Sequence, residues 1–234
     1  MKVTEARFEI IRPQRLDEEA RNSIYQLIEA AGRTCYQSGG GTPESAAKFI
    51  RNAIANQHFS ILEHASMTVR FKVDRGITHE IVRHRLSSFN QESTRYCNYS
   101  KDKFGRDITY IDLEKGMRLC PVTEALPSNK TFQIYSEWRC ACEDAERHYM
   151  RMLDLGASPQ IARSVLNNST KSELVMTANL REWRHFCSLR AAGTTGAPHP
   201  QMIEVAVPLL KAFADFLPEV FGDIWDEVNP KWLE

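Results

Sequence analysis

The spacing of apolar side chains divides the chain into strand-like and helix-like segments. In SMTVRFKV the apolar residues Met67, Val69, Phe71 and Val73 alternate with polar ones, which predicts a strand with one buried face. Three further segments have strand-like composition: residues 2–11, 107–113 and 171–180.

Helical periods fill most of the remaining chain. Ile24, Leu27, Ile28 and Ala31 are spaced for one helix face, and acidic residues precede them, which predicts a helix within residues 15–37. A second helix is expected through residues 46–57, with Thr42 as its cap and Pro43 in its first turn. Further helices are predicted over residues 74–85, 128–155, 181–192 and 200–217, whereas residues 101–127 are rich in turn signals.

These elements favour the α+β class, because helices outnumber strands and do not alternate regularly with them. We expect a single domain over residues 1–234, in which a mixed or antiparallel sheet packs against several helices. The longest of these is expected near residues 128–155.

Composition excludes several classes of protein. Lys plus Arg and Asp plus Glu number 30 each, whereas a generally basic nucleic-acid binder would carry an excess. There is no run of about 18 apolar residues to span a membrane, and the N-terminus lacks the apolar core of a signal peptide. The six cysteines have no CxxC spacing, so they are interpreted as reduced thiols of a cytoplasmic protein.

One short stretch, RHRLSSFNQESTRY at residues 83–96, concentrates positive charge in this neutral chain. If residues 76–86 are helical, Arg83 and Arg85 leave the helix in nearly opposite directions. One helix would then serve two anion sites, or one site and a subunit interface. The alternative is that both arginines pair with carboxylates elsewhere in the chain.

The residues after this predicted helix supply further hydrogen-bond donors. NQESTRY, residues 90–96, brings amide, hydroxyl and guanidinium groups that can surround a phosphate and contact the edge of a planar ring. Ser93 lacks the GxSxG context of a hydrolase nucleophile.

RHR, seven residues and then Ser, continuing into Arg-Tyr, resembles the signature of the flavin-dependent thymidylate synthases. The match extends to His58 with SILEH and to TANLREWRHFCSLR, and it covers roughly residues 30–210. The resemblance implies an enzyme that makes dTMP from dUMP, with methylenetetrahydrofolate as carbon donor and NADPH as reductant through FAD. It also implies a homotetramer with active sites shared between subunits.

The resemblance assigns roles by position. Residues expected to bind the flavin are His58, Ser60, Glu63, Arg83, His84, Arg85, Asn90, Gln91, Asn179, Arg181, His185 and His199. Residues expected to bind dUMP are Glu80, Arg83, Gln91, Ser93, Thr94, Arg95, Arg163 and Arg190. Of these Arg190 is the expected catalytic residue, a fixed cation against the pyrimidine ring that stabilises negative charge.

The chemistry of the residues agrees with a flavin carrier. No cysteine lies in a recognisable catalytic motif, and a cofactor that performs the transfer leaves the protein to bind, orient and polarise. FAD is expected to bind noncovalently. Because the chain has no GxGxxG pattern, its diphosphate would be held by side chains, chiefly Arg83 and Arg85.

Three other interpretations compete with this one. His58, Glu63 and His64 could form a metal cluster, but HxxxxEH is not a known ligand spacing, so no metal is expected. The chain could be a nucleotide- or RNA-binding module without catalysis, in which Phe89, Tyr96 and Tyr99 stack on bases. It could also be a different flavin-dependent enzyme that modifies nucleotides.

Overall fold

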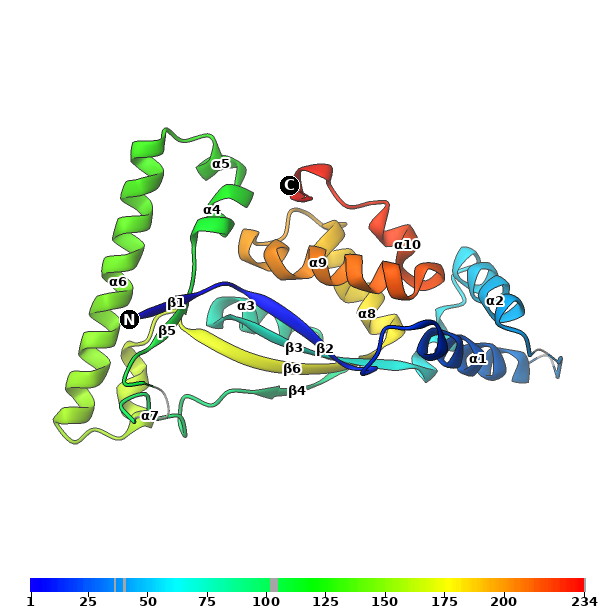
Figure 1. Ribbon diagram of the computed structural model, residues 1–234, viewed down its shortest axis with the longest axis horizontal. Coiled ribbons are helices and arrows are strands. Elements are labelled where there is room, and N and C mark those ends of the chain that lie inside the picture. The colour runs from blue at the N-terminus through cyan, green and yellow to red at the C-terminus, as the bar shows by residue number, and fades with distance from the viewer. Residues whose placement is uncertain (36, 40, 102–104, 234) are drawn as a thin grey trace. The chain divides into compact units, whose positions relative to one another are not determined.

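The computed structural model describes residues 1–35, 37–39, 41–101 and 105–233 (Figure 1). Its chain forms two compact units, each assembled from three separate stretches. The first unit, called here the α6 unit, contains Met1–Arg7, Phe71–Arg83 and Phe89–Val175. The second, called here the α9 unit, contains Phe8–Arg70, His84–Ser88 and Met176–Glu234.

Four strands form one sheet in the order β2-β3-β6-β4. Their bounds are Arg7–Arg12 for β2, Ser66–Asp74 for β3, Ser87–Gln91 for β4 and Lys171–Asn179 for β6. Neighbouring strands run in opposite directions (Figure 1). A separate parallel pair joins β1 (Lys2–Thr4) to β5 (Thr109–Ile111). The predicted alternation in β3 is confirmed, because all four of its apolar residues are buried.

The α6 unit packs around the long helix α6 (Ser128–Asp154). Its core holds Tyr99, Ile108, Tyr110, Cys142, Tyr149 and Ala162. The amino group of Met1 donates to Glu146 of α6 at 2.7 Å. Its other helices are α3 (Arg75–Ile81), α4 (Glu114–Leu119), α5 (Pro121–Glu124) and α7 (Pro159–Ala162).

The α9 unit is built on helix α9 (Pro200–Phe216), most of whose side chains are buried. Edge-on aromatic packing joins Trp183 to Phe213, with ring centroids 5.3 Å apart. The other helices of this unit are α1 (Glu18–Thr34), α2 (Pro43–Ala55), α8 (Leu180–Cys187) and α10 (Pro218–Trp225). Thr42 caps α2 as predicted, since its hydroxyl accepts from the backbone N–H of Ser45.

The α+β class is confirmed, and helices 128–155 and 200–217 lie within one residue of their predicted ends. The single domain over residues 1–234 stays a prediction. No helix among the described residues is long and apolar enough to cross a membrane.

The helix predicted over residues 74–85 is wrong at its end. Helix α3 stops at Ile81, with Val82 as its C-cap, and strand β4 begins at Ser87. Arg83 and Arg85 therefore lie in the connection between a helix and a strand. The two side chains therefore do not leave one helix in opposite directions, as was predicted.

Three smaller expectations also changed. The strand predicted over residues 2–11 is two strands, β1 and β2, and helices α4 and α5 lie in the region predicted to be turns. Leu27, assigned to the buried face of α1, is half exposed. Tyr36, in the segment 15–37 predicted to contain a helix, lies outside the described residues, as do residues 102–104 of the turn-rich region.

Candidate active site

Two segments of the predicted flavin site come together in the α9 unit. The short 3-10 helix Phe59–His64 lies against α8, where Arg181 donates to Glu63 at 2.6 Å. The backbone N–H of Leu180 donates to the carbonyl of Ala65 at 2.9 Å. The side chains of His58, Ser60, Glu63, Arg181 and His185 are all exposed.

Helix α8 begins directly where β6 ends, because Asn179 caps it. The Asn179 side-chain oxygen accepts from the backbone N–H of Glu182 at 2.9 Å. This cap fixes the first turn of α8, which carries Arg181 and Glu182. Asn179, predicted to contact flavin, thus also holds the site's helix in place.

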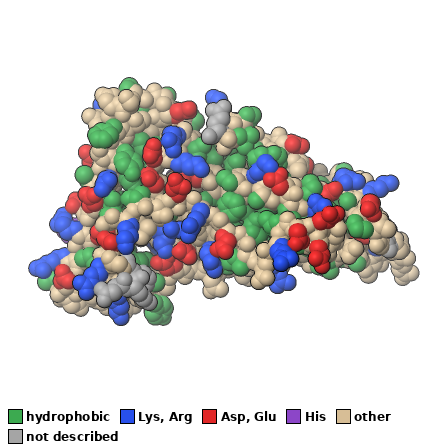
Figure 2. Space-filling view, in the orientation of Figure 1, with side chains coloured by type: hydrophobic (Ala, Val, Ile, Leu, Met, Phe, Trp, Pro, Cys, Tyr) green, Lys and Arg blue, Asp and Glu red, His purple; other side chains and the backbone are tan. Residues whose placement is uncertain are grey.

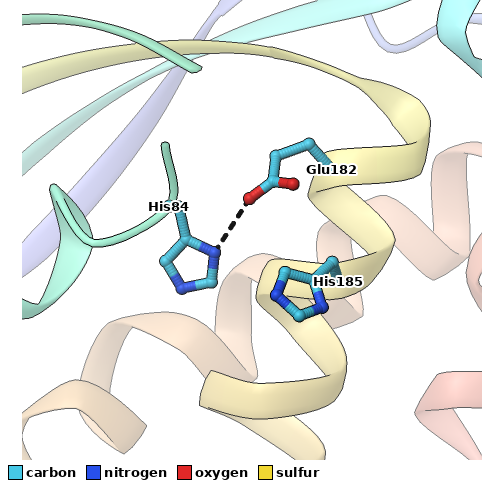
Figure 3. Close-up of side chains that lie close together, drawn as sticks. All are labelled: His84, Glu182 and His185. Atoms are coloured by element: carbon cyan, nitrogen blue, oxygen red, sulfur yellow. Dashed lines mark hydrogen bonds and ion pairs between the residues drawn. The ribbon is translucent and has the colours of Figure 1, made fainter. Parts of the chain in front are cut away.

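A buried cluster forms where the RHR segment meets α8 (Figure 3). His84 is 4% exposed, and its Nδ1 lies 3.1 Å from Oε1 of Glu182. On the opposite side of the ring, Nε of Arg190 donates to Nε2 of His84 at 3.3 Å. Phe186 packs beside the imidazole at a ring distance of 4.9 Å. Because Nε2 accepts, the proton of a neutral His84 lies on Nδ1 and is donated to Glu182.

The surroundings of His84 keep it neutral. Burial, reinforced by the positive charge of Arg190 and by His185, lowers the pKa of His84 from 6.5 to about 4. Burial also raises the pKa of Glu182. The contact between them is therefore a hydrogen bond to a neutral imidazole, not an ion pair.

Acidification is expected to destabilise the protein through His84. An unfolded histidine binds a proton near pH 6.5, whereas folded His84 stays neutral down to about pH 4. Its stabilising contribution is complete above the unfolded pKa and is lost as the pH falls toward the folded value. The total loss is about 3 kcal/mol.

Denaturant unfolding of the wild type and His84→Gln at about pH 7 and about pH 4.5 measures this loss. The stability difference between the two proteins should shift against the wild type at the lower pH. Glu182 is common to both, so its titration largely cancels. A difference that is independent of pH would contradict a neutral, buried His84.

The same cluster has the composition of a metal site. Among the described residues, His84, Glu182 and His185 form a group whose ligand atoms all lie within 4.8 Å of one another. His58, Glu63 and His64 form no such group. However, the Arg190 guanidinium donates to Nε2 of His84. The positive charge of this guanidinium would repel a metal ion bound beside it. The arrangement suits a hydrogen-bonded chain better than a metal.

A small open cleft of about 340 Å³ lies in the α9 unit between the start of β4 and the end of β6. It is lined by Ser66, Arg85, Leu86, Ser87, Ser88, Thr177, Ala178 and Asn179. The buried hydroxyl of Ser87 has no hydrogen-bond partner among the described residues. The cleft is surrounded by a guanidinium, several hydroxyls and an amide. Such groups donate hydrogen bonds to anions.

The predicted dUMP residues of the α6 unit form a second cluster. Arg163 donates to the hydroxyl of Thr94 at 3.1 Å, and Thr94 is buried. The backbone N–H of Arg95 donates to the hydroxyl of Ser93 at 3.3 Å, and the exposed Arg95 guanidinium lies over the ring of Tyr96. Arg163, far away in sequence, therefore lies beside the segment 93–95.

Gln91 is held by the α6 unit itself. Its amide nitrogen donates to the hydroxyl of Thr78 at 2.9 Å and to that of Ser172 at 3.2 Å. Both N–H groups of the amide are thereby used, so its carbonyl oxygen is the atom suited to accept from a ligand.

The remaining predicted residues are exposed, apart from Glu80, which is half-buried. Arg83 and Asn90 are exposed in the α6 unit, and Glu80 precedes the end of α3, where its carbonyl accepts from the N–H of Arg83. His199 is exposed in the α9 unit, where its Nδ1 accepts from the N–H of Gln201 at the start of α9. Its side chain therefore has a structural role whether or not it contacts flavin.

Three residues that contact predicted site residues were not predicted from the sequence: Glu182, Thr78 and Ser172. For Glu182 a signal exists, since Asn179-x-x-Glu182 has the form of a capping box. That motif would have predicted that Glu182 bonds back to the backbone, but its carboxylate contacts His84 instead. No local signal links Thr78 or Ser172 to Gln91.

Comparison with known proteins gives the family of this chain. The family described as thymidylate synthase complementing protein matches residues 19–219. The flavin-dependent thymidylate synthase of Mycobacteroides abscessus is 32% identical over 208 residues, covering 84% of this chain and 78% of the relative. The enzyme of the same description from Mycobacterium tuberculosis is 34% identical over 206 residues, with the same coverage.

Two solved structures are similar to this chain over nearly its full length. The UMP/dUMP methylase PolB of Streptomyces cacaoi, bound to 5-Br UMP, has a TM-score of 0.74 and 25% identity, and the match covers 98% of this chain and 99% of that one. Its complex with 5-Br dUMP has a TM-score of 0.72 and 26% identity. The chain therefore belongs to the flavin-dependent thymidylate synthase family of enzymes.

Proposed function

We propose that this protein converts dUMP to dTMP by reductive methylation, with methylenetetrahydrofolate as carbon donor and NADPH as reductant through bound FAD. Its relatives are named flavin-dependent thymidylate synthases, and a similar solved structure is a UMP/dUMP methylase. Within the structure, the contact that carries the proposal is the hydrogen bond from Arg163 to Thr94. It joins two residues that are expected to bind dUMP, and it brings Arg163 beside Arg95.

The residues of the α9 unit fit a flavin dinucleotide. Arg85 and the hydroxyls around the cleft, including the unpartnered one of Ser87, suit a diphosphate. The exposed donors on the 3-10 helix and on α8 suit the polar edge of a flavin ring. When bound, FAD supplies hydride and carbon transfer, so that no protein nucleophile is needed.

The residues of the α6 unit bind and orient the nucleotide. Arg95 and Arg163 hold the phosphate, with Ser93 and Thr94 between them. Arg95 can make two parallel bonds to a phosphate. The carbonyl of Gln91 accepts from a ring N–H of the pyrimidine.

Arg190 has the catalytic role in this proposal. It places a fixed positive charge against the pyrimidine ring, where it stabilises the negative charge that develops as the ring is activated. Its own position is fixed by the hydrogen bond to His84.

Tritium release from dUMP labelled at the carbon that receives the methyl group tests this function. We expect release that depends on methylenetetrahydrofolate, NADPH and FAD together. A yellow protein with no release would favour a different flavin-dependent enzyme that modifies nucleotides. A colourless protein that binds no FAD would favour the noncatalytic nucleotide- or RNA-binding module. On the face shown in Figure 2, acidic and basic side chains are interspersed, whereas a general RNA binder gathers basic side chains on its binding face.

Catalysis is expected to survive replacement of each cysteine by alanine. Burial raises the pKa of Cys187 and Cys142, which makes both poor nucleophiles. Cys120 is the stringent case, because a hydrogen bond from Thr123 lowers its pKa. dTMP formation should stay measurable in all six variants. A variant that folds and binds FAD and dUMP but makes no dTMP would overturn the carrier mechanism.

The assembly we propose is a homotetramer with shared active sites, formed by one domain over residues 1–234 in the cytoplasm. Flavin that bridges two chains would stabilise such an assembly by mass action. We expect Arg85→Ala and Arg190→Ala chains, each inactive alone, to regain activity when assembled together, because one pocket then receives both arginines from intact copies. Light scattering reports the assembly. A fully active monomer would contradict the shared site.

A further inference from the structure

We propose that Glu182 is a positioning residue for this enzyme, which acts through His84 to hold Arg190. Glu182 lies on α8, His84 follows α3 in the RHR segment, and Arg190 lies in the π-helical turn Ser188–Ala192. The inference deepens the proposed function, because it rests on the catalytic role given to Arg190.

Three side chains form one directed chain of hydrogen bonds. Nδ1 of His84 lies 3.1 Å from the Glu182 carboxylate, and Nε of Arg190 lies 3.3 Å from Nε2 of His84. Both His84 and Glu182 are at most 5% exposed, so water competes little for either bond. Figure 3 shows the carboxylate approaching the imidazole from α8.

The carboxylate fixes which nitrogen of His84 carries the proton. A neutral imidazole has one N–H, and Glu182 can only accept while ionised, so the proton stays on Nδ1. If it moved to Nε2, an N–H would face the N–H of Arg190 and two donors would meet. Only the Nδ1–H tautomer gives Arg190 an acceptor.

The carboxylate also strengthens that acceptor. A histidine that donates to a carboxylate becomes more basic at its other nitrogen, an effect familiar from metal-bound histidines. Nε2 is thus a better acceptor for Arg190 than an isolated neutral imidazole would be. Nε is the guanidinium nitrogen of Arg190 that this hydrogen bond holds.

The first test needs neither substrate nor flavin. In the ligand-free wild type near pH 7, the ¹⁵N shifts of the two His84 ring nitrogens should identify Nδ1 as protonated and Nε2 as unprotonated, and a His84→Gln variant assigns the signals. A dominant Nε2–H tautomer, or a charged ring, would overturn the proposal. This result is independent of whether the protein makes dTMP.

The second test removes only the charge, with Glu182→Gln. A glutamine amide can donate or accept, so His84 should become a mixture of tautomers and the Nε–H of Arg190 should exchange faster with water. We expect kcat for dTMP formation to fall about 10–100-fold with a smaller change in KM for dUMP. The proposal is contradicted if the tautomer of His84 and kcat both stay unchanged in this variant. It is also contradicted if kcat falls while the tautomer stays unchanged.

Asp223→Asn is the matched control. It also removes one carboxylate that contacts α8, where Asp223 pairs with Arg184 at 2.6 Å, but it lies outside the hydrogen-bonded chain. His84 signals and kcat should stay at wild-type values in this variant. If Glu182→Gln fails to fold, the wild-type tautomer decides the matter. If the tautomer shifts as expected but no variant or wild type makes dTMP, the proposed function fails and the positioning stands.

Discussion

Replacing Arg190 with alanine is expected to lower the rate of methyl transfer to dUMP by about 100–1,000-fold, the usual cost of removing one donor that stabilises developing charge. Oxidation of NADPH by the flavin should be at least partly retained, because that step does not need the pyrimidine to be polarised. Tritium release and NADPH consumption, measured on the same preparation, separate the two steps.

Arg190→Lys is the informative companion variant. Lysine keeps the charge but loses the planar fork and the Nε–H that bonds to His84, so we expect partial rescue only. A wild-type rate of methyl transfer in Arg190→Ala would remove this residue from the active site. Equal loss of methyl transfer and NADPH oxidation would indicate that the residue serves flavin binding instead.

Replacing Arg83 and Arg85 together with alanine is expected to release the flavin. Among the described residues, neither guanidinium has a side-chain partner. The alternative in which both arginines pair with carboxylates of this chain is therefore not supported by any ion pair between these residues. Exposed arginines without partners suit an anionic ligand. The absorbance spectrum after desalting should lose its flavin bands.

Arg139→Ala with Arg147→Ala is the matched control for this double variant. Both arginines are exposed on α6 and pair with nearby carboxylates. The control removes two positive charges, as the double variant does, and it changes no residue predicted to bind flavin. This control should remain yellow. Full flavin retention in the Arg83 and Arg85 double variant would defeat the assignment of the diphosphate to these side chains.

The elements that sequence analysis predicted well are those with long periodic patterns. Strand β3 and helices α6 and α9 extend over many residues, so each period is sampled several times. The end of α3 was missed because VRHR is as compatible with a turn as with a helix, and only the pairing of β4 with β6 in the sheet decides against the helix. Such pairing depends on residues far away in the sequence.

The candidate site, too, could be predicted only in part from the sequence. A signature in one stretch of sequence can nominate Arg83 to Arg85 and the segment around Ser93, but it does not reveal which residues touch. The partners of His84 are separated from it by about a hundred positions, and Glu182 carries a local signal that suggests a different role. Contacts of this kind become visible only once α8 is placed.

The way the chain crosses between its two units has a consequence for its synthesis. The α6 unit draws on residues up to Val175, so all of its stretches exist once that position has been made. The α9 unit takes its central helix from residues after Met176, although its first stretch begins at Phe8. During synthesis, helices α1 and α2 can pack on each other early, but the side of α2 that packs on α10 stays uncovered until the last quarter of the chain has been made. A nascent chain stalled before that point is expected to need chaperones more than the finished one.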